Sequence, residues 1–294
     1  MKNKIKLKLK TFLQGIVIIF VREFIRLRYG ASEIKGKDYI NSQTLKNRLN
    51  RNSFYSYLEP CQSILEIGCF DRPSLKFLDK NRKIDYADYF SKDELINRAR
   101  KLGRNEKGIP DIKYVLSEGY DQIEEVYDAV VSNHCVEHVP DLIRHLKKVI
   151  KIIDGKGAYM FSVPDKRLTF DHFIRESTIL DIIAAYLEKK EKPSLVSVME
   201  HYLFTSHEWF LGKKKYETNN ILKSEEIDSL FHRYLSSSYV DVHCWQFTPE
   251  SMKKIINQLA ELGFIKKPKS LKVFPYGGAH EFYVCINFSD KINL

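Results

Sequence analysis

The sequence predicts an α/β fold, with a doubly wound, mostly parallel sheet of seven strands and an inserted subdomain after the fifth strand. Three observations carry this prediction. From residue 63 onward, short apolar runs alternate with longer amphipathic runs, as in strand–helix units of a parallel sheet. The 294 residues are 44% hydrophobic and 29% charged, which is enough to bury a sizeable core. Residues 165–247 are rich in aromatic and basic side chains and interrupt the alternation, which resumes at Thr248.

The N-terminal extension, residues 1–59, precedes the predicted core at residues 60–164. Its apolar stretch 12–21 has about half the ~20 residues that a membrane-spanning helix needs, and no small-residue cleavage site follows it. We therefore expect residues 1–29 not to span a membrane. Apolar residues at helical spacing between lysines and arginines predict an amphipathic helix. It either lies on an anionic membrane surface or packs on the protein's own core or on a second subunit.

The core elements follow in order along the chain. We expect a helix around residues 42–57, strands at 63–67, 84–87, 112–116, 129–132 and 157–164, and helices from Pro73, at 92–101 and at 141–153. In the C-terminal part, residues 248–294, Thr248 is a predicted N-cap, with Pro249 in the first turn and Gly263 just past the last. Strands at 271–274 and 281–287 close the sheet.

The insertion, residues 165–247, falls between the fifth strand and the last helix. It should lie beside the carboxyl ends of the strands, where open α/β sheets bind ligands. We therefore interpret it as a lid or an acceptor-binding subdomain. Its aromatic residues either stack on a sugar or base or form a small core of their own: Tyr202, Phe204, Trp209, Phe210 and Tyr216.

The turn after the first strand, in "SILEIGCFDRPSLKFL", has a single glycine, Gly68. A dinucleotide-binding turn has three, which let the backbone approach a pyrophosphate and the helix pack on its strand. Phe70 and Arg72 make such a cradle unfavourable. S-adenosylmethionine carries no phosphate and needs only the first glycine bare. Glu66 would accept a hydrogen bond from its ammonium group, and amides at 71–74 would face its carboxylate.

A ribose requires an acid at the tip of the second strand, and Asp88 lies 20 positions after Gly68. An ordinary loop carboxylate or helix cap is the alternative interpretation of Asp88. The remaining expected cofactor contacts are residues at or near the strand tips: Cys69, Phe70, Tyr89, Ser117, Asn133 and His134.

Four segments, "ILEIGCF", "YADYF", "YDAVVSNHCVEHVPDL" and "GKGAYMFSVPDKR", resemble class I S-adenosylmethionine-dependent methyltransferases, which have a Rossmann-like fold. Over residues 60–288 the chain is similar to a bacterial group found with surface-polysaccharide genes, through "VPDKRLTFD" and "DVHCWQFTPESM". The resemblance implies a cytoplasmic O-methyltransferase that acts on a sugar or sugar-nucleotide intermediate of a capsule or lipopolysaccharide and releases S-adenosylhomocysteine. The single glycine departs from the family's usual motif.

Methyl transfer to a hydroxyl requires alignment and removal of one proton. The loops after the fourth and fifth strands hold the candidates, and in similar sugar methyltransferases the base comes from these loops. We expect His138 and Asp165 to form an oriented general base, with His134 beside them. A histidine that only pins its loop is an equal alternative for His138. Expected acceptor contacts are Arg167, Asp171, His172, His243 and Trp245.

The loop's His134, Glu137 and His138 have a spacing that also allows a divalent metal, but a sulfonium needs no metal activation, so none is expected. Five widely spaced cysteines without a C-x-x-C pair indicate neither a disulfide framework nor a zinc site and fit a reducing cytoplasm. The net charge of +10 favours anionic partners or reflects solvated lysines alone. "SNHCVEH" stands where amino-directed base methylases carry an Asn/Asp-Pro-Pro-aromatic motif, which disfavours nucleic acid. N-methylation of an aminosugar and a non-catalytic partner subunit stay open.

Overall fold

The computed structural model describes residues 54–75, 78, 81–205, 224–237, 240–274 and 280–292. The expectations for the N-terminal amphipathic helix and for Trp209, Phe210 and Tyr216 lie outside these residues, as does most of the helix expected at 42–57, of which 54–56 are helical. None of the helices in the described part of the chain has the length and apolar content that crossing a membrane requires.

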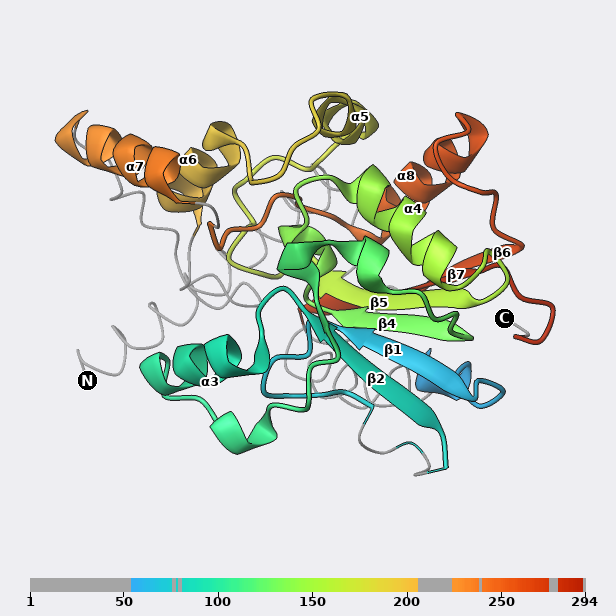
Figure 1. Cartoon of the computed structure of the whole chain (residues 1–294). Coiled ribbons are helices and arrows are strands. Elements are labelled where there is room, and N and C mark those ends of the chain that lie inside the picture. Colours follow the sequence, from blue (N-terminus) through green and yellow to red (C-terminus); the bar gives the residue numbers. More distant parts are fainter. Residues whose placement is uncertain are drawn as a thin grey trace, which may run out of the picture. The chain divides into compact units, whose positions relative to one another are not determined.

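The sheet has seven strands in the order β3-β2-β1-β4-β5-β7-β6 (Figure 1). The strands are β1 Ser63–Ile67, β2 Lys83–Asp88, β3 Tyr114–Val115, β4 Ala129–Asn133, β5 Ala158–Pro164, β6 Ser270–Phe274 and β7 Glu281–Asn287. The first five run parallel, and β7 pairs antiparallel with both β5 and β6. The predicted fold class is therefore confirmed.

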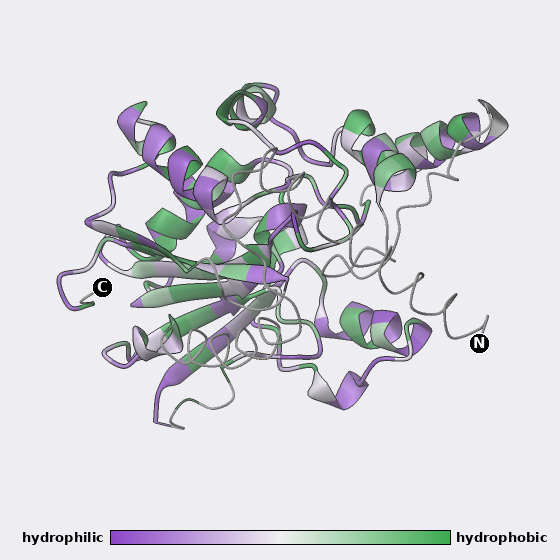
Figure 2. Ribbon diagram, turned by 180° about the vertical axis from the view of Figure 1, so that it is seen from behind, coloured by the Kyte–Doolittle hydropathy of each residue, from purple (hydrophilic) through white to green (hydrophobic). Residues whose placement is uncertain are grey.

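Both faces of the sheet are covered, as expected for parallel strands with near-continuous apolar sequences. Successive residues of β4 point to opposite faces, so Val130 belongs to one core cluster while Ala129 and Val131 belong to the other. The first cluster is covered by α4 Leu142–Ile152, α5 Ile179–Leu187 and α8 Pro249–Glu261, which lie on one side of the sheet (Figure 1). In Figure 2 the central strands are largely hydrophobic, and α4 and α8 carry hydrophilic stripes.

Capping side chains set where the helices begin. Ser91 and Glu94 form a capping box at the start of α3 Lys92–Lys101, and Asp141 caps α4. Thr248 caps α8 as predicted, with Pro249 in its first turn and Gly263 at φ +76° after its end.

The segment after β1 differs from the prediction. In the described part of residues 73–78 there are turns and no helix, and the amide of Ser74 donates to Glu66 at 2.7 Å. Because the Glu66 side chain accepts this hydrogen bond, the backbone forms a turn where the first turn of a helix was expected. The strand expected at 112–116 is shorter, at Tyr114–Val115, and Leu116 begins a 3₁₀ helix, Leu116–Glu118. Other short 3₁₀ helices occur where no helix was expected: Glu106–Gly108, Tyr120–Gln122 and Val136–His138.

The insertion contributes α5, α6 Leu195–Phe204 and α7 Ser224–Ser236. It has a small core of its own, in which Val198, Leu230 and Val242 are buried together. Tyr202 and Phe204 stay 38% and 41% exposed, so neither is part of that core. The boundaries at 60, 165 and 248 remain predictions.

Candidate active site

The tip of β1 must be a glycine. Gly68 has φ +75°, and its amide donates to the Ala87 carbonyl at 2.9 Å, which ties the tip of β1 to β2. A Cβ atom at this position would lie 3.1 Å from Sγ of Cys135, in a backbone conformation that side chains rarely adopt. The absence of a side chain at Gly68, which we predicted from cofactor binding, is therefore also required by packing against Cys135.

Asp88 ends β2, and its neighbour Ala87 is paired in register with Ile67, the residue before Gly68. The carboxylate is buried and accepts two long hydrogen bonds, both of 3.4 Å, from the amides of Phe70 and Phe90. Burial raises the pKa of Asp88, and these amides oppose the shift. A buried carboxylate with weak internal partners beside a bare glycine fits the two ribose hydroxyls of S-adenosylmethionine.

Polar side chains connect the tips of β1, β4 and β5. Glu66 Oε1 accepts hydrogen bonds of 2.7 Å from both the amide and the hydroxyl of Ser74. Asn133 donates to the Ser74 hydroxyl at 3.0 Å and accepts from Ser162 at 2.9 Å. The Ser74 amide, which we expected to face the cofactor carboxylate, is thus bound to Glu66 instead.

The other expected cofactor residues lie at the tips of β1, β2 and β3. Cys69 is buried, and Phe70, at φ +46°, lies beneath the Arg104 guanidinium, 4.6 Å from its ring centroid. The Tyr89 carbonyl accepts a hydrogen bond of 3.2 Å from the Ser117 amide. The predicted residues thus occupy adjoining strand tips, and their contact with a cofactor stays a prediction.

His134 follows β4 with φ +49° and is held between two glutamates. Its Nε2 donates to Glu281 at 2.7 Å, and its Nδ1 lies 3.4 Å from Glu137. Burial alone would lower the pKa of His134, but the two carboxylates raise it to about 10. An imidazole that stays protonated cannot accept a proton, so this histidine is poorly suited to act as the base.

The expected pair of His138 and Asp165 is not formed among the described residues. The Asp165 carboxylate is bound by Arg167 through the amide at 3.0 Å, Nε at 2.9 Å and Nη2 at 2.6 Å. The nearest carboxylate to His138 Nδ1 in an ion pair is that of Asp241, at 3.4 Å. The local turn after β5 brings Arg167 back onto Asp165, which sequence spacing did not reveal. The Asp165 carboxylate thereby neutralises the charge of Arg167, the residue that we expected to bind the acceptor.

A different imidazole–carboxylate pair occupies the site. His243 Nδ1 lies 2.5 Å from Asp171 Oδ2, and both side chains are buried. The His243 ring meets the His138 ring edge-on, with centroids 4.7 Å apart. Although burial alone would lower the pKa of His243, Asp171 and then Glu137 raise it. The two partners are 72 positions apart in the sequence, and no local pattern predicts their pairing.

The loop that carries His138 is fastened to the segment that carries His243. The Cys244 amide donates to the Glu137 carbonyl at 2.7 Å, and Trp245 Nε1 donates to the Val139 carbonyl at 2.6 Å. Trp245 is buried in the main core, so its role is to hold this segment in place. His172 is also buried, its Nδ1 donates to the Arg167 carbonyl at 2.9 Å, and burial lowers its pKa to about 4.

The sequence of residues 38–264 matches the family model described as "Methyltransferase domain". The chain belongs to this methyltransferase family. It is a methyltransferase, and S-adenosylmethionine is its cofactor, in agreement with the bare tip at Gly68 and the buried acid at Asp88. No curated protein matches the sequence significantly.

Solved structures show similarity at low identity. The methyltransferase domain of bacterial CtHen1 is 14% identical, with 84% of this chain and 99% of that chain covered and a TM-score of 0.41. The plantazolicin methyltransferase BpumL, solved with a triazolic desmethyl-plantazolicin analogue and S-adenosylhomocysteine, is 10% identical, with 84% of this chain and 85% of that chain covered and a TM-score of 0.38.

Proposed function

We propose that this methyltransferase transfers the methyl group to a hydroxyl of a sugar or sugar nucleotide, within the synthesis of a surface polysaccharide. The observation that carries the proposal is the buried His243–Asp171 pair in contact with His138. His138 and Asp171 follow the fourth and fifth strands, and His243 lies just before α8. A hydroxyl must lose its proton when it is methylated, and an oriented imidazole is a suitable acceptor for that proton.

The chain's own residues divide the work. S-adenosylmethionine supplies a methyl group already activated on a sulfonium. Gly68 leaves room for it at the strand tip, and Asp88 binds the ribose. Asp171 orients His243 through Nδ1, which leaves Nε2 to take the hydroxyl proton while the oxygen–methyl bond forms and the sulfur–methyl bond breaks. The edge-on ring of His138 restricts how the His243 ring can turn.

The sugar class rests on the two segments that resemble the polysaccharide group, and the structure brings these segments together. Asp165, from "VPDKRLTFD", forms a parallel bridge with Phe247, from "DVHCWQFTPESM". The Lys166 amide donates to the Phe247 carbonyl at 2.9 Å, and Asp171 pairs with His243 across the same two segments. Both segments therefore build one site, which supports a shared task at the acceptor.

The test is transfer of labelled methyl groups from S-adenosylmethionine to a panel of nucleotide sugars, with RNA and a peptide mixture in parallel. We expect label in a nucleotide sugar, as an alkali-stable methyl ether. His243→Ala should lower kcat by about 10²–10⁴-fold, while affinity for S-adenosylhomocysteine, measured by calorimetry, stays unchanged. Arg233→Ala on α7, at 5.1 Å from the Tyr202 ring, is a control outside the cluster.

Label found only in RNA or peptide would contradict the sugar acceptor. Transfer that survives the loss of His243 would contradict the proton-acceptor role. Cofactor affinity without transfer to any acceptor would favour a non-catalytic partner subunit. The cytoplasmic location is part of the same proposal, and contact of residues 1–29 with the inner membrane face is tested by flotation with anionic vesicles.

A further inference from the structure

Glu137 is a buried carboxylate whose ion-pair partner among the described residues is His134. It is 1% exposed, and neither carboxylate oxygen has a hydrogen-bond partner within the described residues. The nearest positively charged group in an ion pair is His134, whose Nδ1 is 3.4 Å away. A buried carboxylate without hydrogen bonds costs several kcal/mol unless a cation accompanies it. His134 lies beside Oε1, so Oε2 is the buried oxygen that a further cation could bind.

Two imidazoles face this carboxylate. His138 follows Glu137 directly, and His243 comes from the C-terminal end of the insertion. One ligand atom of each of the three residues lies within 4.8 Å of the other two. Ligands that are each about 2.1 Å from one ion in tetrahedral geometry are about 3.4 Å apart, so side-chain shifts of about 1 Å would complete the site.

The surroundings orient these ligands. Asp171 binds Nδ1 of His243 and leaves Nε2 available, which is the usual arrangement of a carboxylate behind a metal-bound histidine. The second oxygen of Asp171 is buried and has no hydrogen-bond partner within the described residues. The Cys244 amide on the Glu137 carbonyl, and Cys244 Sγ on the His138 carbonyl at 3.4 Å, hold the two ligand-bearing segments together. These contacts restrain the two segments that carry the ligands before an ion binds.

We propose that Glu137, His138 and His243 form a binding site for a divalent transition-metal ion. Two imidazoles and one carboxylate suit manganese, iron, cobalt or zinc better than magnesium or calcium, which prefer oxygen ligands. Three protein ligands leave positions open for water or an acceptor hydroxyl. This replaces His134 of the spacing-based set with His243, because both nitrogens of His134 face glutamates.

The consequence for catalysis rests on the proposed function, whereas ion binding does not. A hydroxyl bound to the ion would have a lower pKa, so the ion would take over the task that Nε2 of His243 has in its absence. Methyl transfer would then depend on the ion even though the sulfonium needs no activation.

The test measures ion binding in the absence of cofactor and acceptor. The full chain is stripped with a chelator and titrated with Mn²⁺ and with Zn²⁺, and binding is followed by calorimetry and by the paramagnetic signal of Mn²⁺. We expect one ion per chain and a higher melting temperature on binding. Glu137→Gln and His243→Asn should each weaken binding by about 100-fold or more, and Asp171→Asn, a positioning change, by about 10–100-fold.

The matched control is His232→Asn, which removes an exposed histidine on α7 and should leave affinity unchanged. Far-ultraviolet circular dichroism and urea unfolding verify that each variant is folded. Absence of binding by the wild-type chain, or equal affinity in folded variants, would overturn the site. Ion binding without methyl transfer would overturn the proposed function alone, and chelator-resistant transfer would overturn only the catalytic consequence.

Discussion

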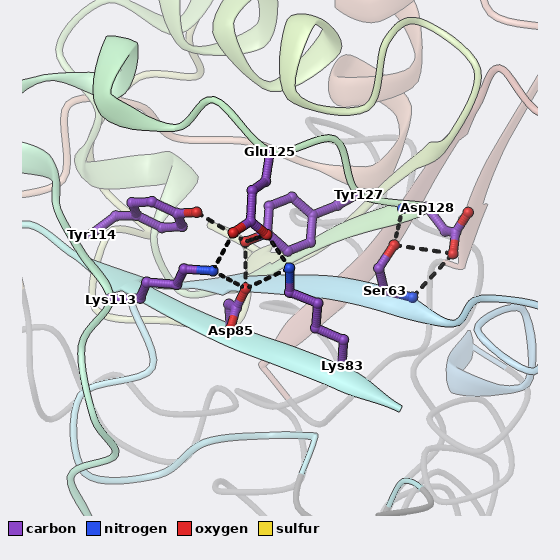
Figure 3. Close-up of polar contacts among 8 residues, drawn as sticks. All are labelled: Ser63, Lys83, Asp85, Lys113, Tyr114, Glu125, Tyr127 and Asp128. Carbon is purple, nitrogen blue, oxygen red and sulfur yellow. Dashed lines mark hydrogen bonds and ion pairs between the residues drawn. The ribbon is translucent and has the colours of Figure 1, made fainter. Parts of the chain in front are cut away.

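The two edges of the sheet both gather charged and polar side chains, but they do so in different ways. At the amino ends of the strands, Lys113 binds Asp85 at 2.8 Å and Glu125 at 2.6 Å, and Lys83 binds Glu125 as well (Figure 3). These groups are partly exposed, and each charge has a close partner. At the carboxyl ends, Glu137 and Asp171 are buried and have oxygens without hydrogen-bond partners in the described structure.

The difference separates structural from functional electrostatics. Paired charges at half-exposed positions contribute little each and mainly hold neighbouring strands in register. Buried polar groups that the protein does not satisfy cost stability and persist where a ligand or a reaction uses them. We therefore expect substitutions at the amino edge to change stability and substitutions at the carboxyl edge to change binding and turnover.

The largest expected effect comes from two aspartates on the same strand, β2. Asp88→Asn removes the carboxylate that we propose binds the ribose hydroxyls, and affinity for S-adenosylhomocysteine should then fall by about 100-fold, or about 3 kcal/mol. Asp85→Asn is the matched control, three residues earlier at the other edge, and should lower the free energy of unfolding without changing that affinity. Calorimetry measures the affinity and urea unfolding measures the stability. Unchanged affinity in Asp88→Asn together with reduced affinity in Asp85→Asn would contradict the contrast between the two edges.

The second effect is on the pH dependence of stability. His145 is buried between the hydroxyls of Tyr120, at 2.7 Å, and Tyr159, at 2.8 Å, and burial lowers its pKa to about 4. The unfolded chain, with a histidine pKa near 6.5, binds the proton more readily between these values. Stability should thus be complete above about pH 6.5 and decrease by about 3 kcal/mol as the pH falls to about 4.

Urea unfolding across this pH range measures the slope, and His145→Gln should flatten it. His172, whose pKa burial also lowers to about 4, keeps part of the slope in the variant. An unchanged slope in His145→Gln would show that this histidine is not responsible for the acid sensitivity.

Much of this fold could be predicted because the determinants are local. The alternation of apolar runs predicted β1 and β7 to the residue, and Thr248 with Pro249 predicted where α8 begins. The positions of Gly68 and Asp88 could also be predicted, because each follows from where a strand ends and these two strands are consecutive in the sequence. Their adjacency follows from parallel pairing of β1 with β2.

The acceptor side could not be predicted to the same extent because its contacts join distant segments. Arg167 binds Asp165 through a local turn that the spacing of residues does not reveal. His243 pairs with Asp171 only once the insertion is folded. His243 and Asp171 were recognised as acceptor candidates, yet their pairing depends on tertiary structure. No sequence periodicity relates a histidine and a carboxylate that are 72 positions apart, so their pairing cannot be predicted from the sequence.

The third effect, on stability alone, concerns Tyr127 at the amino edge. Its side chain is 1% exposed, and its hydroxyl donates to Asp85 at 2.5 Å and lies 3.3 Å from the Tyr114 hydroxyl. Tyr127→Phe should lower the free energy of unfolding by about 2 kcal/mol, because it removes a part-buried hydrogen bond to a charged group. Tyr114→Phe removes only the neutral contact and should cost less. Equal losses in urea unfolding would mean that Asp85 contributes nothing to this bond.

The smallest effect is expected at Glu125, whose pKa is lowered to about 2 by hydrogen bonds to Lys113 and then Lys83. The lowered pKa means that its contribution to stability is present above about pH 4.5 and lost as the pH falls toward 2. Because the carboxylate is exposed and screened, Glu125→Gln should lower the melting temperature only slightly, and about 1 M salt should abolish the difference. A large decrease in melting temperature that salt does not reduce would mean that the exposed charges at the amino edge behave like the buried charges at the carboxyl edge. The proposed contrast between the two edges would then be wrong.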